Sequence, residues 1–342
     1  MKPLRGSLAA AFFAAILRAA EHQSVTDPAG PQSGRIASLW WFFFAVTCAV
    51  FVIVMALALW TLIHRSRGIA QEPLEARHLP SQQTERKLGR VVTGGTIATV
   101  VILFVLLIAS IGTGKSISEL GNKNNGLTVE VTGNQWWWQI RYINSDASQI
   151  VTTANEIHIP VGRPVLIRGL SNDVIHSFWI PSLHGKRDLI PSRVTTEWIQ
   201  ADRPGLYRGQ CAEFCGLQHA HMILYVVAEA PDKFRNWYRG QLQPASEPSD
   251  AVRAHGRQIF ANYACVFCHT IRGTSASGQN APDLTHFGSR LGIAANTLPN
   301  TLGNLGGWIV DPQGVKPGNH MATIAVKSDD LQPLLEYLES LK

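Results

Sequence analysis

The sequence contains one short stretch rich in sulfur and imidazole side chains, Cys211-Ala212-Glu213-Phe214-Cys215-Gly216-Leu217-Gln218-His219-Ala220-His221-Met222, and a further histidine, His176, lies upstream. Sulfur ligands are soft and imidazole nitrogen is borderline, a mixture that copper favours. A tetrahedral zinc ion could bind two cysteines and two histidines, but it would gain nothing from Met222. A single blue copper needs one cysteine, so the economical interpretation is a pair of copper ions bridged by both sulfurs. A disulfide between Cys211 and Cys215, or a structural zinc, is the alternative.

Several segments around this stretch, in the same order, resemble subunit II of cytochrome c oxidase. They are His176-Ser177-Phe178-Trp179-Ile180-Pro181, Asp188-Leu189-Ile190-Pro191, Arg203-Pro204-Gly205-Leu206-Tyr207, and Gly209-Gln210-Cys211 through Met222. The resemblance implies a dinuclear copper A centre and argues against zinc and a disulfide. It further implies that the Glu213 carboxylate faces subunit I, where it helps hold a magnesium ion. The implied copper ligands are His176, Cys211, Cys215, His219, Met222 and the backbone carbonyl of Glu213.

Composition indicates a mixture of membrane and soluble parts. At 342 residues and 46% hydrophobic content, the chain is long enough for two or three domains. Its 30 Lys and Arg exceed its 24 Asp and Glu only modestly, and they form no basic block. Nucleic-acid binding is therefore not expected.

Two long segments, residues 36–63 and 91–114, contain no charged residue. About 20 apolar residues suffice to cross a bilayer, so both segments are predicted to span it as a helical hairpin within residues 36–114. The segment between them carries an excess of cations, which the positive-inside rule places in the cytoplasm. Everything after residue 114 is then predicted to lie outside, on the periplasmic side of a bacterial inner membrane. These cations are Arg65, Arg67, Arg77, Arg86, Lys87 and Arg90, against Glu72, Glu75 and Glu85.

The first 35 residues have the composition of a weak secretory signal. Lys2 and Arg5 precede an apolar run at residues 8–17, and Ala19-Ala20 follows it. This order predicts cleavage near residue 20, whereas Arg18 favours an uncleaved N-terminal arm.

The chain after residue 114 changes to short β-branched and aromatic runs separated by Gly, Pro and Asn. Such runs predict a sandwich or barrel of short strands, and a cupredoxin-like all-β barrel over residues 115–240 fits the resemblance. The expected strands are residues 127–131, 164–170, 195–199, 205–210 and 222–228.

Three consecutive tryptophans, Trp136, Trp137 and Trp138, follow the first expected strand. Side chains alternate sides along a strand, so these three cannot all face one core. Ordinary packing under the barrel is one interpretation. The resemblance implies another, in which an aromatic side chain over the copper centre is the point where electrons arrive; Trp136 is the first choice and Trp137 the second.

A second cofactor motif lies near the C-terminus. Cys265-Val266-Phe267-Cys268-His269 matches the c-type heme attachment pattern, in which two thiols form thioethers and the histidine binds iron. A redox or zinc fragment is the alternative for this string alone. Helices predicted at residues 255–262 and 328–341, the latter capped by Ser328, Asp329 or Asp330, favour an all-α class I cytochrome c domain over residues 251–342. A helix at residues 232–242 and a Pro- and Ser-rich linker at 241–250 precede it.

The second iron ligand is expected from Lys316-Pro317-Gly318-Asn319-His320-Met321, which resembles the loop that supplies it in small cytochromes c. Met321 is the predicted ligand, and a Met/His pair raises the heme potential. His320 is the competing candidate.

The predicted architecture is therefore multi-domain, with a two-helix hairpin, a cupredoxin-like barrel and a cytochrome c domain. The resemblance implies an oxidase subunit that takes electrons at its own heme c, passes them to copper A and delivers them to subunit I for oxygen reduction coupled to proton pumping. Subunit III, membrane lipid and an external donor, such as a cytochrome c or a quinol-cytochrome c reductase, are the other expected partners. A copper-A nitric oxide reductase and a membrane copper-binding assembly module are alternatives. The proton-channel pattern of the family's second helix is absent around residues 85–101, so no such residue is assigned.

Overall fold

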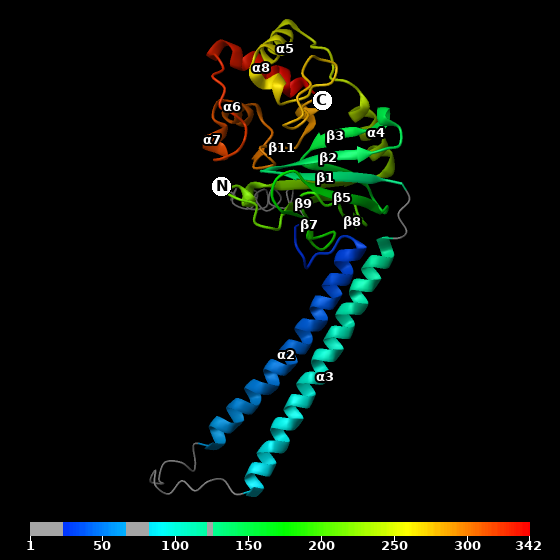
Figure 1. Ribbon diagram of the computed structural model, residues 1–342, viewed down its shortest axis with the longest axis vertical. Coiled ribbons are helices and arrows are strands. Elements are labelled where there is room, and N and C mark those ends of the chain that lie inside the picture. Colours follow the sequence, from blue (N-terminus) through cyan, green and yellow to red (C-terminus); the bar gives the residue numbers. More distant parts are fainter. Residues whose placement is uncertain (1–22, 66–81, 122–125) are drawn as a thin grey trace, which may run out of the picture. The chain divides into compact units, whose positions relative to one another are not determined.

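The computed structural model describes residues 23–65, 82–121 and 126–342 (Figure 1). The chain forms two compact units, one of Arg35–Leu120 and one that joins the chain up to Gly34 with Gly121–Lys342. The expected signal peptide and its cleavage site near residue 20 lie outside the described residues.

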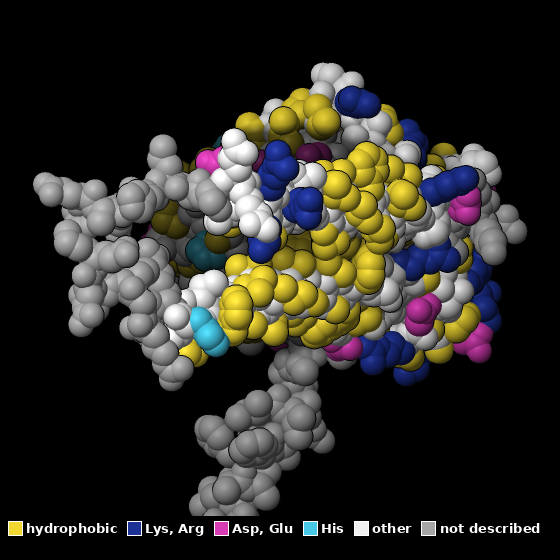
Figure 2. Space-filling view, turned by 90° about the horizontal axis from the view of Figure 1, so that it is seen from below, with side chains coloured by type: hydrophobic (Ala, Val, Ile, Leu, Met, Phe, Trp, Pro, Cys, Tyr) yellow, Lys and Arg dark blue, Asp and Glu magenta, His cyan; other side chains and the backbone are white. Residues whose placement is uncertain are grey.

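Two helices, α2 (Pro31–Arg65) and α3 (Gln82–Gly121), contain the charge-free segments. At 1.5 Å per residue they are about 50–60 Å long, more than the roughly 30 Å of a bilayer core. Both are long and apolar enough to cross a membrane. Large apolar side chains are exposed along both helices, and Figure 2 shows hydrophobic side chains in a continuous band. Both helices extend beyond the predicted spans because flanking Gln, Glu, Lys and Arg residues are good helix formers.

The chain just before α2 and its first residues are fixed to the β-strands of their own unit. The Ala29 N–H donates to the Ser182 carbonyl at 2.7 Å, and the Gln32 side chain donates to the Trp198 carbonyl at 2.6 Å. Arg203 pairs with Asp27 at 2.7 Å. These contacts order the chain from residue 23 up to the start of the helix.

Residues 126–242, here called the β-domain, form two five-stranded sheets and a final helix, α4 (Pro231–Leu242). One sheet has the order β3 (Val151–Ala154), β2 (Trp137–Ile143), β1 (Thr128–Asn134), β5 (Val165–Ser171) and β8 (Thr195–Ile199). The other has the order β4 (Glu156–Pro160), β10 (Ile223–Glu229), β9 (Gly205–Cys211), β6 (His176–Trp179) and β7 (Arg187–Leu189). A core of fully buried aromatic and branched side chains fills the space between the sheets.

All five strands expected from the sequence are present, as β1, β5, β8, β9 and β10. The expectation missed β2, β3, β4, β6 and β7, most of which are short. Along β2 the side chains alternate, with Trp138 fully buried and Trp137 half-buried. Trp136 and Trp138 belong to the same core and Trp137 does not, so the prediction that the three tryptophans cannot all face one core is confirmed.

Residues 251–342, here called the helical domain, contain α5 (Ala251–Asn262), α6 (Leu302–Val310), α7 (Pro312–Val315) and α8 (Ser328–Ser340), with a small ribbon of β11 (Gly292–Ile293) and β12 (Leu298–Pro299). Helices α5 and α8 pack so closely at Gly256 that a Cβ there would lie 2.0 Å from the Pro333 carbonyl oxygen. The predicted cap of α8 was wrong, because Lys327 occupies the N-cap position without a side-chain bond. Asp329 and Asp330 instead lie in the first turn, where their negative charges interact favourably with the helix dipole.

The connection between the two domains begins after Leu242, where α4 ends as predicted. It is also bound to the helical domain. The Ala245 N–H donates to the Arg272 carbonyl at 2.9 Å, and Arg272 donates to the Leu242 carbonyl at 3.2 Å. The start of the linker is therefore fixed to the helical domain.

Candidate functional site

The expected copper ligands come from one hairpin loop and one neighbouring strand. Cys211 ends β9, Met222 immediately precedes β10, and the Cys211 N–H donates to the Met222 carbonyl at 3.1 Å, which closes the loop at its base. His219 begins a short 3-10 helix, His219–His221. His176 begins β6, which pairs with β9. Two hydrogen-bonded strands thus hold the loop and the distant histidine together.

The donor atoms of these residues converge. His176 Nδ1 lies 3.9 Å from Cys211 Sγ, and His219 Nδ1 lies 3.6 Å from Cys215 Sγ. Met222 Sδ lies 4.0 Å from Cys215 Sγ, and the Glu213 carbonyl oxygen lies 3.2 Å from Cys211 Sγ. The ligand atoms of His176, Cys211 and Cys215 are all within 4.8 Å of one another. This set of soft and borderline donors fits a copper pair.

Both cysteines are free and buried. Hydrogen bonding from Cys215 lowers the pKa of Cys211 to about 3, whereas Cys211 and burial raise the pKa of Cys215. The two adjacent sulfurs therefore disfavour simultaneous deprotonation. A second buried negative charge would be costly unless cations compensate it, so the pair favours metal in the fully deprotonated form.

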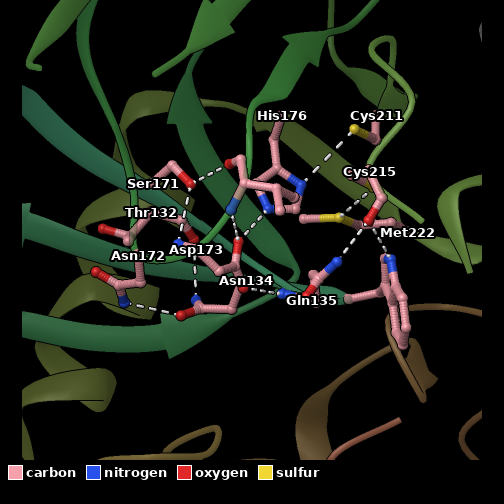
Figure 3. A network of polar contacts seen from close by, with 12 residues as sticks. Thr132, Asn134, Gln135, Ser171, Asn172, Asp173, His176, Cys211, Cys215 and Met222 are labelled. Atoms are coloured by element: carbon pink, nitrogen blue, oxygen red, sulfur yellow. Dashed lines mark hydrogen bonds and ion pairs between the residues drawn. The ribbon is translucent and has the colours of Figure 1, made fainter. Parts of the chain in front are cut away.

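Asp173 positions the His176 ring, as Figure 3 shows. Asp173 Oδ1 lies 2.7 Å from His176 Nε2, and Asp173 Oδ2 accepts the Gln135 N–H at 2.6 Å. Because Nε2 is engaged, Nδ1 is directed at the sulfurs, the usual way in which an outer carboxylate orients a metal-binding histidine. Asp173 was not predicted from the sequence, although an acidic residue three positions before the histidine was an available signal.

Trp136 contacts the ligand loop directly. Its side chain is 7% exposed, and its Nε1–H donates to the Cys215 carbonyl at 2.9 Å. Trp138 was not predicted to take part in the site. Its Nε1–H donates to the Met222 carbonyl at 3.3 Å, and its ring lies edge-on to the His176 ring, with the ring centroids 6.0 Å apart. Trp137 lies between them on β2, opposite Asn134, and the alternation of the strand turns it away from Trp138.

The Glu213 carboxylate lies at the surface. It pairs with Lys186 at 3.2 Å, and the two side chains are 44% and 52% exposed. The carbonyl of Glu213 faces Cys211 while its carboxylate is directed outward, so the two predicted roles of this residue use opposite ends of it.

The predicted heme ligands surround an apolar cavity of the helical domain. Cys265, His269 and Met321 line it together with Phe260, Leu284, Phe287, Leu305, Trp308, Ile309, Ile324, Val326, Leu334 and Leu338. Cys268 is exposed beside it. His269 Nδ1 lies 2.8 Å from the Pro282 carbonyl, and burial lowers the pKa of His269, so a neutral ring keeps Nε2 for iron. The ring centroids of His320 and Trp136 lie 6.3 Å apart. An apolar cavity with these donors fits a covalent heme.

Comparison with known proteins agrees with this geometry. A family model described as cytochrome c oxidase subunit II, periplasmic domain, matches residues 143–229, and one described as cytochrome c matches residues 253–342. Cytochrome c oxidase subunit 2 of Alkalihalophilus pseudofirmus is 32% identical over 330 residues, which cover 94% of this chain and 92% of that protein. The chain belongs to the cytochrome c oxidase subunit 2 family.

Other relatives of this subunit 2 are similar in part. The subunit 2 of Bacillus sp. strain PS3 is 31% identical over 266 residues, covering 72% of this chain and 73% of that protein. The crystal structure of the periplasmic domain of subunit II of cytochrome oxidase from Bradyrhizobium japonicum is 29% identical and covers 33% of this chain and 91% of its own, with a TM-score of 0.31.

As a subunit 2 with a cytochrome c domain, the chain is part of a heme-copper oxidase, an oxidoreductase, and its partner is subunit I. The first matched domain implies copper A and the second implies heme. Two apolar helices and a periplasmic domain fit a membrane-anchored protein whose cofactors lie on the extracytoplasmic side.

Proposed function

We propose that this subunit 2 takes electrons into the oxidase through its own helical domain and delivers them to subunit I, which reduces oxygen to water and pumps protons. When bound, the heme and the copper pair supply the redox relay. The protein holds them with Cys265, Cys268, His269 and Met321 on one side, and on the other with His176, Cys211, Cys215, His219, Met222 and the Glu213 carbonyl.

The position of Trp136 carries this proposal. One edge of its ring is bonded to the Cys215 carbonyl, and Gly318 of the helical domain lies against the ring on another side. A Cβ at Gly318 would be 3.7 Å from Trp136 Cη2 and 3.1 Å from Leu217 Cδ1. Gly318 has φ +80, which a side chain rarely adopts, so glycine brings this backbone close to the indole. Trp136 thus bridges the ligand loop and the loop that ends in Met321.

Burial of the copper donors favours electron transfer over copper delivery. His176 and Met222 are fully buried, and Cys211 and Cys215 are each 3% exposed. A module that exchanges copper would need accessible ligands. The curated relatives are named cytochrome c oxidases, which favours oxygen over nitric oxide as the final acceptor.

Two further roles extend the proposal to partners. The exposed Glu213 carboxylate would help hold magnesium against subunit I, exchanging its pairing with Lys186 for the ion. An external cytochrome c, or a quinol-cytochrome c reductase, would donate to the helical domain, and subunit III would complete the complex in a bacterial plasma membrane.

The test replaces Trp136 by alanine in the complete oxidase. Heme reduction by a light flash should then leave electrons on the heme for longer, because the indole bridge is lost, while both cofactors stay bound. We expect transfer to slow about tenfold or more, about 1.4 kcal/mol in activation free energy. Absorption at the heme and copper bands measures both steps.

Trp137→Ala is the matched control, since it removes the neighbouring indole from the other face of β2. Copper reduction at the wild-type rate in Trp136→Ala would contradict the bridge. If Trp137→Ala were the slow variant instead, the path would run through the second predicted tryptophan.

A further inference from the structure

The loop that ends in Met321 begins at a buried lysine that binds the other domain. Lys316 is 2% exposed. Its ammonium donates to the Trp136 carbonyl at 2.8 Å, the His221 carbonyl at 2.8 Å and the Ala294 carbonyl at 3.0 Å. The first two acceptors belong to the β-domain, with His221 inside the copper loop, and the third belongs to the helical domain. One side chain therefore uses all three ammonium donors at the interdomain contact.

The residues around Lys316 add further bonds across the same contact. The Gln218 side chain donates to the Pro317 carbonyl at 2.7 Å. Ala294, Ala295 and Asn296 are three consecutive left-handed residues, with φ of +51, +56 and +57. Non-glycine residues persist in this conformation when their surroundings determine it strongly.

Each residue of that turn has a role in the contact. The Ala294 carbonyl accepts Lys316, the Ala295 carbonyl accepts the Ile223 N–H at 3.3 Å, and the Asn296 side chain donates to the Asn155 carbonyl at 2.9 Å. The turn and Lys316 together are here called the clasp.

A lysine is an unusual residue to bury, because its charge loses solvation. Burial lowers the pKa of Lys316 to about 7. The three carbonyls replace part of the water that the ammonium gives up when the domains dock, and these bonds hold only in this placement of the domains. If the domains separated, the Trp136 and His221 carbonyls would each lose this partner. The arrangement is therefore suited to hold one relative placement of the two domains.

We propose that Lys316 is a positioning residue that clasps the helical domain onto the β-domain, with the backbone of Trp136 and His221 as its partners, so that the Met321 loop stays against the Trp136 ring. This inference rests on the proposed function, because it assigns the clasp to the transfer between the two cofactors. The two domains are then docked before an electron arrives. The rate of electron transfer is therefore not limited by movement of the helical domain.

The test uses Lys316→Met in the complete oxidase, a change that keeps much of the side chain's length and removes its donors. Hydrogen exchange measures docking directly. The Ile223 amide, which donates to Ala295, and the peptide around Trp136 belong to the β-domain and should exchange about tenfold or more faster, since one charge-assisted bond contributes about one decade of equilibrium constant. The strands that pair away from this contact, β1 and β5, should be unchanged.

The rate of heme-to-copper electron transfer after a light flash is the second measurement. Its dependence on viscosity would not change if Lys316 had only a local structural role. In the wild type we expect a rate independent of solvent viscosity. In Lys316→Met the rate should fall about tenfold and decrease further as viscosity rises, with heme and copper absorption and both potentials unaltered. Lys327→Met, an exposed lysine of the same domain, is the matched control.

If Lys316→Met fails to bind heme or copper, Asn296→Gly replaces it, because glycine adopts the left-handed backbone and only the side-chain bonds to the β-domain are lost. Unchanged exchange at Ile223 and a viscosity-independent rate in the variant would overturn the clasp. Absence of heme-to-copper transfer in the wild type would instead overturn the proposed function, so the two failures are distinguishable.

Discussion

The two cofactor sites of this protein are built in opposite ways. The copper donors lie in one loop and one adjacent strand, and their atoms converge within a few ångströms in a β-domain whose packed core includes Cys211, Cys215 and Met222. The heme donors are separated by the length of the helical domain, from Cys265 to Met321, and they line an apolar cavity. Copper is added to a finished scaffold, whereas heme occupies part of a core.

This difference has an energetic consequence. Apolar side chains that line a cavity lose the contacts that a filled core provides, so a domain of this size without its heme lacks much of its stabilisation. The β-domain has sheet hydrogen bonds and buried Trp138, Tyr142 and Phe178 whether or not copper is present. We therefore expect the helical domain, and not the β-domain, to depend on its cofactor for folding.

The largest expected effect comes from removing both thioether anchors, Cys265→Ala with Cys268→Ala. Loss of covalent heme should cost on the order of the whole folding free energy of a domain, about 5–15 kcal/mol. Hydrogen exchange should then show α5 and α8 unprotected, with β1 and β5 still protected. If α5 and α8 kept their protection from exchange, the helical domain would fold without heme. The expected difference between the two domains would then be wrong.

A smaller effect on folding is expected from Cys215→Ser. It should abolish the copper pair, seen as loss of the paramagnetic signal of an electron shared by two copper nuclei, because one bridging sulfur is gone. The β-domain should lose only about 1 kcal/mol, as for an ordinary point mutation. Cys48→Ser, at an exposed position of α2, is the matched control and should leave the signal intact. Unfolding of the β-domain in Cys215→Ser would show that copper is structural there too.

The smallest effect on cofactor binding is expected from Met321→Ala, because the thioethers still hold the heme. Removing the thioether should abolish the weak sulfur-to-iron absorption band and lower the heme potential. The domain should lose about 2 kcal/mol, the lower end for a buried methionine, since Met321 is half-buried. A ferric spectrum unchanged in Met321→Ala but altered in His320→Ala would assign the iron ligand to His320.

Residue type and spacing, together with the resemblance to subunit II of cytochrome c oxidase, were sufficient to predict the fold class and the presence of both cofactor motifs. Ligand chemistry is local, so the stretch from Cys211 to Met222 and the Cys265–His269 motif are visible in the chain itself. The membrane helices follow from the length of the charge-free runs. The strands β1 and β10 were found, whereas β6 and β7 were missed because three or four residues carry too little pattern. The strand β2 was missed although its seven residues alternate.

The tertiary structure alone decided which residues support the ligands. Trp138 is an ordinary side chain in the sequence, and only the packing of the two sheets brings it beside His176, whereas Asp173 is a near neighbour of His176 in the chain. The role of Lys316 could not be predicted from the sequence either. Its acceptors are backbone carbonyls, which every residue has, and they come from positions up to 180 residues away. Because any residue can supply a backbone carbonyl, the residue types of the acceptors do not reveal these hydrogen bonds. For this reason the cofactors could be predicted from the sequence, but the contact that places one beside the other could not.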